Sequence, residues 1–369
     1  MAVAIRADLA DVPDYNIPRQ TPDAVLLNAN EVPVPPSPAV VEAIARAAVE
    51  GHRYPQWFSD TLVSRLAEVL GVPEPWIGVG CGSVSLCQQL IQAYCGPGDD
   101  IVCAWRSFDA YPVLGRIAGV AVRTVPLDSE HRHDLPAMLD AITPATRLVF
   151  VCNPNNPTGT AVRTQELGEF LDRVPDNVLV VLDEAYREFV TSPDVPDGIA
   201  LALRRQNVAV LRTFSKAYGL AGIRVGYCVA PPAVVAAANK VSVPFAVSSL
   251  AQAAAMAVLD HPGEVRDRIG TVVRERERLH AGLTKLLSCP GHRAVPPSHA
   301  NFLWLPLGER SVAFADFCAR HGVLVRAFPG DGVRITVGLP EENDAFLCAA
   351  DRFAFLAPPR GPRRVPRLT

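Results

Sequence analysis

The sequence has no strong excess of charge of either sign. Its 369 residues include 35 Lys and Arg against 38 Asp and Glu, a net charge of −3. Such a balance leaves no electrostatic footprint for nucleic acid or for an anionic membrane. The sequence also lacks an apolar run of the roughly 20 residues that a membrane helix needs, and its first residues do not form a secretory signal. We therefore expect a cytoplasmic protein without nucleic-acid or membrane partners.

Cysteines in a regular arrangement are absent as well. The nine cysteines are odd in number and scattered through apolar segments, and no two have the C-x-x-C spacing. Disulfide frameworks and zinc sites use recognisable spacings. The pattern favours free thiols in a reducing compartment, and we expect no metal site.

The chain is longer than the roughly 250–300 residues that one hydrophobic core usually supports. Over about 38–255, apolar runs of four to six residues alternate with amphipathic helical patterns. Such short runs are typical of strands buried on both faces, so they predict a mostly parallel sheet. A charged helix over 262–288, with arginines and glutamates on its outer face, then leads into an α+β pattern. We predict an α/β domain over 31–258 and a smaller α+β domain formed by 1–30 and 259–369, ending in a solvated basic tail.

Polar groups follow four of the predicted strands at the point where each strand ends. "NPNNPTGT" (153–160) follows one strand, and Asp183 and Tyr186 of "DEAY" follow a second. "TFSK" (213–216) follows a third, and "CGS" (81–83) opens a helix after a fourth. The carboxyl ends of parallel strands meet at one edge of the sheet, where α/β proteins bind ligands. We therefore expect these groups to lie together.

Each of these segments also has an ordinary structural explanation. The Asn–Pro segment is typical of a turn, Asp183 of a helix N-cap, and Lys216 of a solvated side chain. "GVGCGS" is similar to a dinucleotide fingerprint. It lacks the last glycine spacing, and the next acidic residues precede a strand instead of ending one, so the nicotinamide interpretation fails.

Taken together, the four segments match the groups of pyridoxal 5′-phosphate (PLP). A pyridine nitrogen needs a carboxylate, and a phenolic oxygen needs an amide or phenol donor. A phosphate needs a helix N-terminus with hydroxyls and an arginine, and an aldehyde needs a lysine amine. The sequence places each of these groups at a different strand end.

The segments "NPNNPTG", "DEAY" and "TFSKAYGLAGIRVGY" resemble the class I and II aminotransferases of fold type I. The resemblance covers about nine-tenths of the chain, from "LNANEVPVPPSP" to "VRITVG". Within that family the chain is most similar to the histidinol-phosphate aminotransferase branch, and "SFDAYP" and "FPGDGVRITVG" resemble its aromatic (phenylalanine) aminotransferases. The resemblance implies an α/β fold with a mostly parallel sheet of the seven-stranded type, PLP as cofactor, and a homodimer with shared active sites.

The resemblance also implies a role for each matching residue. Lys216 would form the Schiff base with the cofactor and move the proton at the substrate Cα, while Asp183 would pair with the pyridine nitrogen. Tyr186 and Asn156 would hydrogen-bond the 3′-oxygen. The other cofactor contacts would be Cys81, Gly82, Thr213, Ser215 and Arg224 on the phosphate, Phe108 on the ring face, and Tyr54 on the phosphate of the cofactor bound to the other subunit.

Fewer residues bear on the substrate. Arg334 is implied to bind the substrate α-carboxylate, with Asn156 beside it. Arg326 matches an arginine that binds phosphate in histidinol-phosphate enzymes, although it also fits a surface arginine at a strand edge. Tyr15 is similar to a tyrosine that closes over the substrate. Val32 and Val34 replace the Asn and Phe usual in the family, so we expect a different pocket rim.

We therefore expect transamination of an aromatic L-amino acid with a 2-oxo acid such as 2-oxoglutarate, by ping-pong chemistry through Lys216. Three alternatives stay open at this point: a histidinol-phosphate aminotransferase, a PLP-dependent decarboxylase or lyase of the same fold, and a non-catalytic relative. Arg326 and Arg334 would serve either amino donor. The complete set of cofactor-binding residues argues against the non-catalytic relative.

Overall fold

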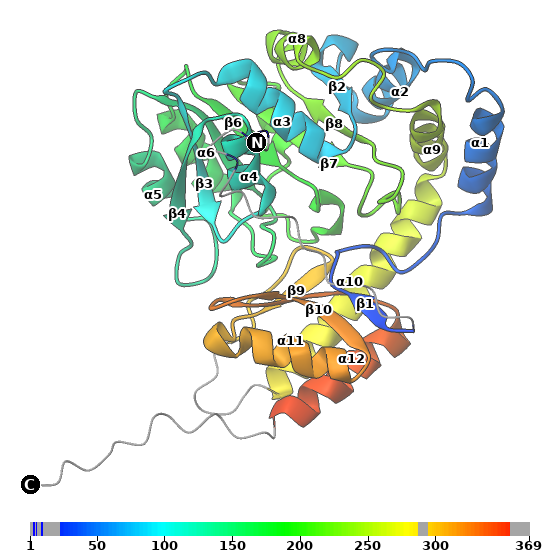
Figure 1. Cartoon of the computed structure of the whole chain (residues 1–369), viewed down its shortest axis with the longest axis vertical. Coiled ribbons are helices and arrows are strands. Elements are labelled where there is room, and N and C mark those ends of the chain that lie inside the picture. Colours follow the sequence, from blue (N-terminus) through cyan, green and yellow to red (C-terminus); the bar gives the residue numbers. More distant parts are fainter. Residues whose placement is uncertain (1–2, 4, 6–8, 10–22, 287–293, 355–369) are drawn as a thin grey trace, which may run out of the picture.

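The computed structural model of the chain describes residues 3, 5, 9, 23–286 and 294–354, and Figure 1 shows its arrangement. Two sheets organise these residues, one of seven strands and one of four. The predicted solvated tail and Tyr15 lie outside the described residues.

The larger sheet has the strand order β2-β8-β7-β6-β5-β3-β4. Neighbouring strands are parallel except around β8, which runs antiparallel to both β2 and β7. The strands are β2 (Ile77–Gly80), β3 (Asp100–Trp105), β4 (Ala121–Pro126), β5 (Thr146–Cys152), β6 (Leu179–Asp183), β7 (Val208–Thr213) and β8 (Gly226–Val229). The predicted mostly parallel α/β fold is confirmed.

Helices cover both faces of this sheet, because its central strands are buried on both sides. One core lies under α3 (Ser83–Tyr94), α4 (Ala110–Ile117) and α8 (Pro232–Lys240). The other lies under α1 (Pro38–Val49), α2 (Asp60–Leu70), α5 (Leu135–Asp140), α6 (Thr164–Arg173), α7 (Gly198–Ala202) and α9 (Ser249–Asp260). Burial on both faces explains why the strands read as continuous apolar runs without alternation.

The smaller sheet has the order β1-β10-β11-β9 and packs against three helices (Figure 1). Its strands are β1 (Val25–Leu27), β9 (Phe302–Leu305), β10 (Val323–Phe328) and β11 (Gly332–Thr336). The helices are α10 (Pro262–Leu286), α11 (Ser311–Arg320) and α12 (Pro340–Ala354). Since β1 pairs in parallel with β10, chain from before residue 30 joins the C-terminal sheet. The domain boundaries at 30 and 258 stay a prediction.

One expectation about α10 is wrong. Its arginines do not all face outward, because Arg276 is only 4% exposed. The guanidinium Nη1 donates to the carbonyl oxygens of Phe189 and Ala300, both at 3.0 Å. Arg276 thereby ties α10 to the segment after β6 and to the segment before β9, and a buried charge of this kind is tolerated only with such partners.

Candidate active site

A cavity of about 250 Å³ opens where the carboxyl ends of β5, β6 and β7 face the smaller sheet. Strand ends supply its floor, and β10 and β11 supply two arginines from the opposite side. Ten of the predicted site residues line it: Phe108, Asn156, Asp183, Tyr186, Thr213, Ser215, Lys216, Arg224, Arg326 and Arg334. Residues from segments up to about 300 positions apart are therefore brought together, as the strand-end argument predicts.

Lys216 lies in the loop that follows β7, with its amine in this cavity. The side chain is half-buried, and Nζ donates to the carbonyl oxygen of Ala29 at 3.1 Å. Loss of hydration, together with the positive charges of Arg334 and Arg224, lowers the pKa of Lys216 to about 7. At neutral pH a large fraction of this amine is therefore uncharged and carries the lone pair that a nucleophile or base needs.

Asp183 is the last residue of β6 and is almost fully buried. Its Oδ2 accepts a hydrogen bond from the Tyr111 hydroxyl at 2.7 Å, whereas Oδ1 has no partner among the described residues. Burial raises the pKa of Asp183 to about 6, against the opposing effect of Tyr111 and the Ala185 amide. A buried carboxylate oxygen without a partner is costly, so the geometry points to a cationic group that Oδ1 receives when the cavity is filled.

Tyr186 and Asn156 each direct a donor toward the cavity. The Tyr186 hydroxyl accepts from Asn30 Nδ2 at 3.0 Å, so its own proton is available to another acceptor. Asn156 Oδ1 accepts from Arg334 Nη1 at 2.6 Å, so its amide nitrogen is available too. Both residues line the cavity, and two available donors there suit an anionic or phenolic oxygen.

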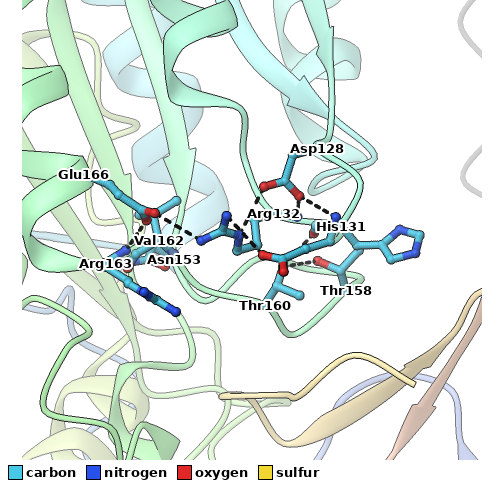
Figure 2. A network of polar contacts seen from close by, with 10 residues as sticks. Asp128, His131, Arg132, Asn153, Thr158, Thr160, Val162, Arg163 and Glu166 are labelled. Atoms are coloured by element: carbon cyan, nitrogen blue, oxygen red, sulfur yellow. Dashed lines mark hydrogen bonds and ion pairs between the residues drawn. The ribbon is translucent and has the colours of Figure 1, made fainter. Parts of the chain in front are cut away.

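The loop 153–160, which carries Asn156, is fixed by the polar network in Figure 2. Asn153 pairs with both backbone groups of Val162, at 2.9 and 3.4 Å. Thr158 and Thr160 share a hydrogen bond of 2.8 Å, and Thr160 donates to the carbonyl of His131 at 2.6 Å. The loop therefore holds Asn156 in place through contacts outside the cavity.

The N-terminus of α3 and Arg224 form one end of the cavity. Arg224 Nη1 donates to Ser215 Oγ at 3.2 Å, and Ser83 and Val84 of α3 line the wall beside Thr213. A Cβ on Gly82 would lie only 2.6 Å from Arg224 Nη2, so the glycine lets the guanidinium lie against the start of the helix. Arg224 itself has φ of 65°, a strained conformation for a side-chain-bearing residue. A guanidinium, hydroxyls and a helix N-terminus together suit a phosphate.

The two arginines of the smaller sheet differ in their surroundings. Arg334 is buried, and its Nη2 donates to the carbonyl of Asn28 at 2.6 Å, so it is held firmly beside Asn156. Arg326 is its register partner on β10 and lies 3.9 Å from Asp109 Oδ2, which also lines the cavity. Burial raises the pKa of Asp109, against the opposing effect of Arg326, Arg106 and Arg334.

Three predicted residues of the described part do not line the cavity. Cys81 and Gly82 lie just before α3, and the Gly82 N–H donates to the Gly80 carbonyl at 2.8 Å, so that amide already has a partner. Tyr54 is 81% exposed and stacks on Phe245 at 4.6 Å, away from the cavity of its own chain.

Sequence reasoning missed three residues that shape the site. Tyr111 and Asn30 orient Asp183 and Tyr186, and Asp109 faces Arg326. Tyr111 looks like an ordinary core aromatic of α4, and Asn30 contacts a residue 156 positions away. Asp109 and Tyr111 both lie in the quoted "SFDAYP" and Asn30 lies in "LNANEVPVPPSP", so the family resemblance was the available signal.

The residues of the cavity fit PLP. The unpartnered Asp183 Oδ1 suits a protonated ring nitrogen, the two donors suit the 3′-oxygen, and the end beside Arg224 suits the phosphate. Lys216 would meet the aldehyde. Within the described residues no group of His, Cys, Asp or Glu side chains is arranged to hold a metal ion.

Known proteins are similar to this chain throughout. A family model described as aminotransferase class I and II matches residues 22–350. An aromatic amino acid aminotransferase of Rhodococcus jostii is 54% identical over 350 residues, covering 95% of this chain and 96% of its own. The Streptomyces avermitilis protein of the same name is 51% identical over 353 residues, covering 95% and 97%.

A solved structure has the same fold as this chain. Histidinol-phosphate aminotransferase from Sinorhizobium meliloti, in complex with pyridoxal-5′-phosphate, superposes with a TM-score of 0.80 at 28% identity. The superposition covers 89% of this chain and 90% of that one.

Proposed function

The chain belongs to the class I and II aminotransferases, and from this premise we propose that it moves the amino group of an aromatic L-amino acid to a 2-oxo acid such as 2-oxoglutarate. It is a PLP-dependent aminotransferase. The observation that carries the substrate proposal is the 50–54% identity to proteins named aromatic amino acid aminotransferase, seen over nearly the whole chain. The cavity supports it, because amine, carboxylate and guanidinium groups converge there.

Lys216 is the residue that we assign to proton transfer. When bound, PLP supplies an electron sink that stabilises negative charge at the substrate Cα. Lys216, with its pKa lowered to about 7, would move the proton from the substrate Cα to the former aldehyde carbon (C4′) of the cofactor in the first half-reaction, and in the reverse direction in the second. An acid–base group works best when its pKa lies near the working pH. The same amine serves both half-reactions of the ping-pong cycle.

Other residues of the cavity hold the substrate and the cofactor beside Lys216. Arg334 binds the substrate α-carboxylate with its planar fork, and Asn156 and Asn28 hold that guanidinium from behind. Asp183 would stabilise positive charge at the ring nitrogen of bound PLP. Tyr186 and Asn156 would donate to its 3′-oxygen. The phosphate would be held by Thr213, Ser215, Arg224 and the start of α3, with Phe108 against the ring.

The pair of Arg326 and Asp109 supports an uncharged aromatic side chain over a phosphorylated one. A guanidinium in this cavity would attract a phosphate, but the Asp109 carboxylate lies beside Arg326 and offsets its charge. A phosphate brought to Arg326 would also be repelled by Asp109. The cavity thus favours an aromatic amino acid over histidinol phosphate, the alternative substrate.

The test is a side-by-side measurement of kcat/KM for phenylalanine, tyrosine and histidinol phosphate. We expect phenylalanine or tyrosine to be preferred. In Asp109→Asn the ratio of histidinol phosphate to phenylalanine should rise about tenfold, because one repelled charge at short range is worth roughly 1.4 kcal/mol.

Asp331→Asn is the matched control for this experiment. Asp331 pairs with Arg106 at 2.6 Å but does not line the cavity, so the ratio should stay at the wild-type value. Preference of the wild type for histidinol phosphate would contradict the proposed substrate class. Product analysis also separates the lyase alternative: phenylpyruvate and glutamate support transfer, whereas release of carbon dioxide contradicts it.

A homodimer with shared active sites is the second part of the proposal. Tyr54, Trp57 and Phe58 are 81%, 51% and 45% exposed, and with Phe245 they form an aromatic surface patch. Val243, two residues before Phe245 in the chain, is 71% exposed. A patch of this kind on a single chain marks an interaction site. A second copy is the partner that fits, with Tyr54 reaching the phosphate of the cofactor in that copy.

The eight described cysteines are free thiols, which supports a cytoplasmic location.

We expect sedimentation of the wild type to give a dimer. The double variant Trp57→Glu, Val243→Glu should be monomeric and retain cofactor poorly, because two carboxylates cannot be buried in an apolar interface. Tyr54→Phe should stay dimeric and bind PLP about tenfold more weakly, through the loss of one hydrogen bond to a charged group. A wild-type monomer that holds PLP fully would contradict the shared site.

A further inference from the structure

Tyr111 and Asp183 form a buried pair beneath the cavity. The Tyr111 hydroxyl donates to Asp183 Oδ2 at 2.7 Å, and the two residues are 0% and 2% exposed. They lie 72 positions apart, on α4 and at the end of β6. The contact is therefore made by the fold and not by local sequence.

The phenol ring of Tyr111 is held from two sides. It stacks on Phe150 of β5 with ring centroids 4.5 Å apart, and the Phe108 ring lies perpendicular to it with centroids 5.5 Å apart. Such packing in a buried core leaves the ring one orientation. The hydroxyl is thus fixed in position toward Asp183.

This arrangement leaves the two oxygens of Asp183 unequal. Oδ2 is occupied by Tyr111, and Oδ1 has no partner among the described residues. We propose that Tyr111 is a positioning residue for transamination: its hydroxyl fixes the Asp183 carboxylate so that Oδ1 stays charged and directed at the ring nitrogen. The inference rests on the role of Asp183 in the proposed function, and it adds a residue that does not touch cofactor or substrate.

The other titratable groups that face Asp183 do not stabilise its ionised form, so the hydrogen bond from Tyr111 matters for the charge of Asp183. The groups that face Asp183 are Cys87 of α3, Tyr111 of α4, Cys152 of β5, and Glu184 and Tyr186 after β6. Burial raises the pKa of both thiols and both phenols, so these four stay neutral, and Glu184 raises the pKa of Asp183. The Tyr111 hydroxyl lowers the pKa of Asp183, which burial has raised to about 6.

Tyr111→Phe keeps the packed ring and removes only the hydroxyl. The pKa of Asp183 should then rise further, so a larger fraction of the carboxyl is neutral at a given pH. We expect the pH below which affinity falls to move upward by about one unit, so that apoenzyme binds PLP about twofold more weakly at pH 7 and about tenfold more weakly at pH 5, since one pKa unit equals tenfold below both pKa values. Titration by fluorescence or absorbance measures this without any substrate.

A double-mutant cycle separates positioning from packing. In an Asp183→Asn background, Tyr111→Phe should change PLP affinity at pH 5 less than twofold, because no carboxylate remains to be charged. Tyr94→Phe, on the half-buried Tyr94 of α3, is the control and should leave both affinity and its pH profile unchanged.

The proposal is overturned if Tyr111→Phe has the affinity and pH profile of the wild type, or if it loses the same affinity in the Asp183→Asn background. Because the readout is cofactor binding, it stands apart from the substrate assay. An enzyme inactive on aromatic amino acids that still showed the pH shift would refute the proposed substrate and leave this inference standing.

Discussion

Replacement of Lys216 by alanine is expected to lower the turnover of phenylalanine with 2-oxoglutarate by about 10⁴-fold, the upper range for loss of a general base. The reason is geometric. Lys216 is the amine that lines the cavity, and its lowered pKa leaves a large fraction of it uncharged at neutral pH. Stopped-flow measurement of a single half-reaction, with product release excluded, reports this loss directly.

The design of the Lys216 experiment includes a surface lysine as its control. Lys240, at the end of α8, is exposed, and Lys240→Ala should keep wild-type rates. Small amines added to Lys216→Ala should restore part of the rate, in proportion to their basicity, if a missing base is the cause. Turnover within tenfold of the wild type in Lys216→Ala would refute the assigned role.

Asp183→Asn is expected to reduce transamination by about 10²–10³-fold, the usual cost of removing one preorganised electrostatic group. Asparagine keeps the shape and can still contact Tyr111, but its neutral amide cannot hold positive charge on a ring nitrogen. We expect the variant to bind PLP measurably, so that the loss appears in kcat more than in cofactor content.

Two measurements test the prediction for Asp183→Asn. Absorbance of the bound cofactor establishes occupancy, and kcat at saturating phenylalanine establishes the chemical effect. Glu184, the next residue, pairs with Arg212 at 2.7 Å. A structural effect of Glu184→Gln would therefore appear as a lower Tm and not as a lower kcat. An Asp183→Asn enzyme with near-normal kcat at full occupancy would show that the carboxylate charge is unnecessary.

The sequence predicts most of the site because strand ends are local features. Asp183 closes the apolar run of β6, and Lys216 follows that of β7. A parallel sheet then brings both to one edge, whatever their separation in the chain. Arg334 required the family resemblance, since it arrives from the smaller sheet.

What the sequence could not predict depends on contacts between distant elements. Tyr111 looks like an ordinary core residue of its helix and Arg276 like an ordinary surface residue. In the fold, Tyr111 donates to a carboxylate and Arg276 donates to two carbonyl oxygens. Gly82 was expected to offer its amide to a phosphate, but local backbone geometry turns it toward Gly80.

The central claim is that one amine, Lys216, meets the cofactor aldehyde. Borohydride reduction of the holoprotein, followed by proteolysis and mass spectrometry, tests it directly. The chain has only three lysines, at 216, 240 and 285, so the labelled peptide is unambiguous. We expect one phosphopyridoxyl group per chain, on Lys216. A label on Lys240 or Lys285, or none at all, would contradict it.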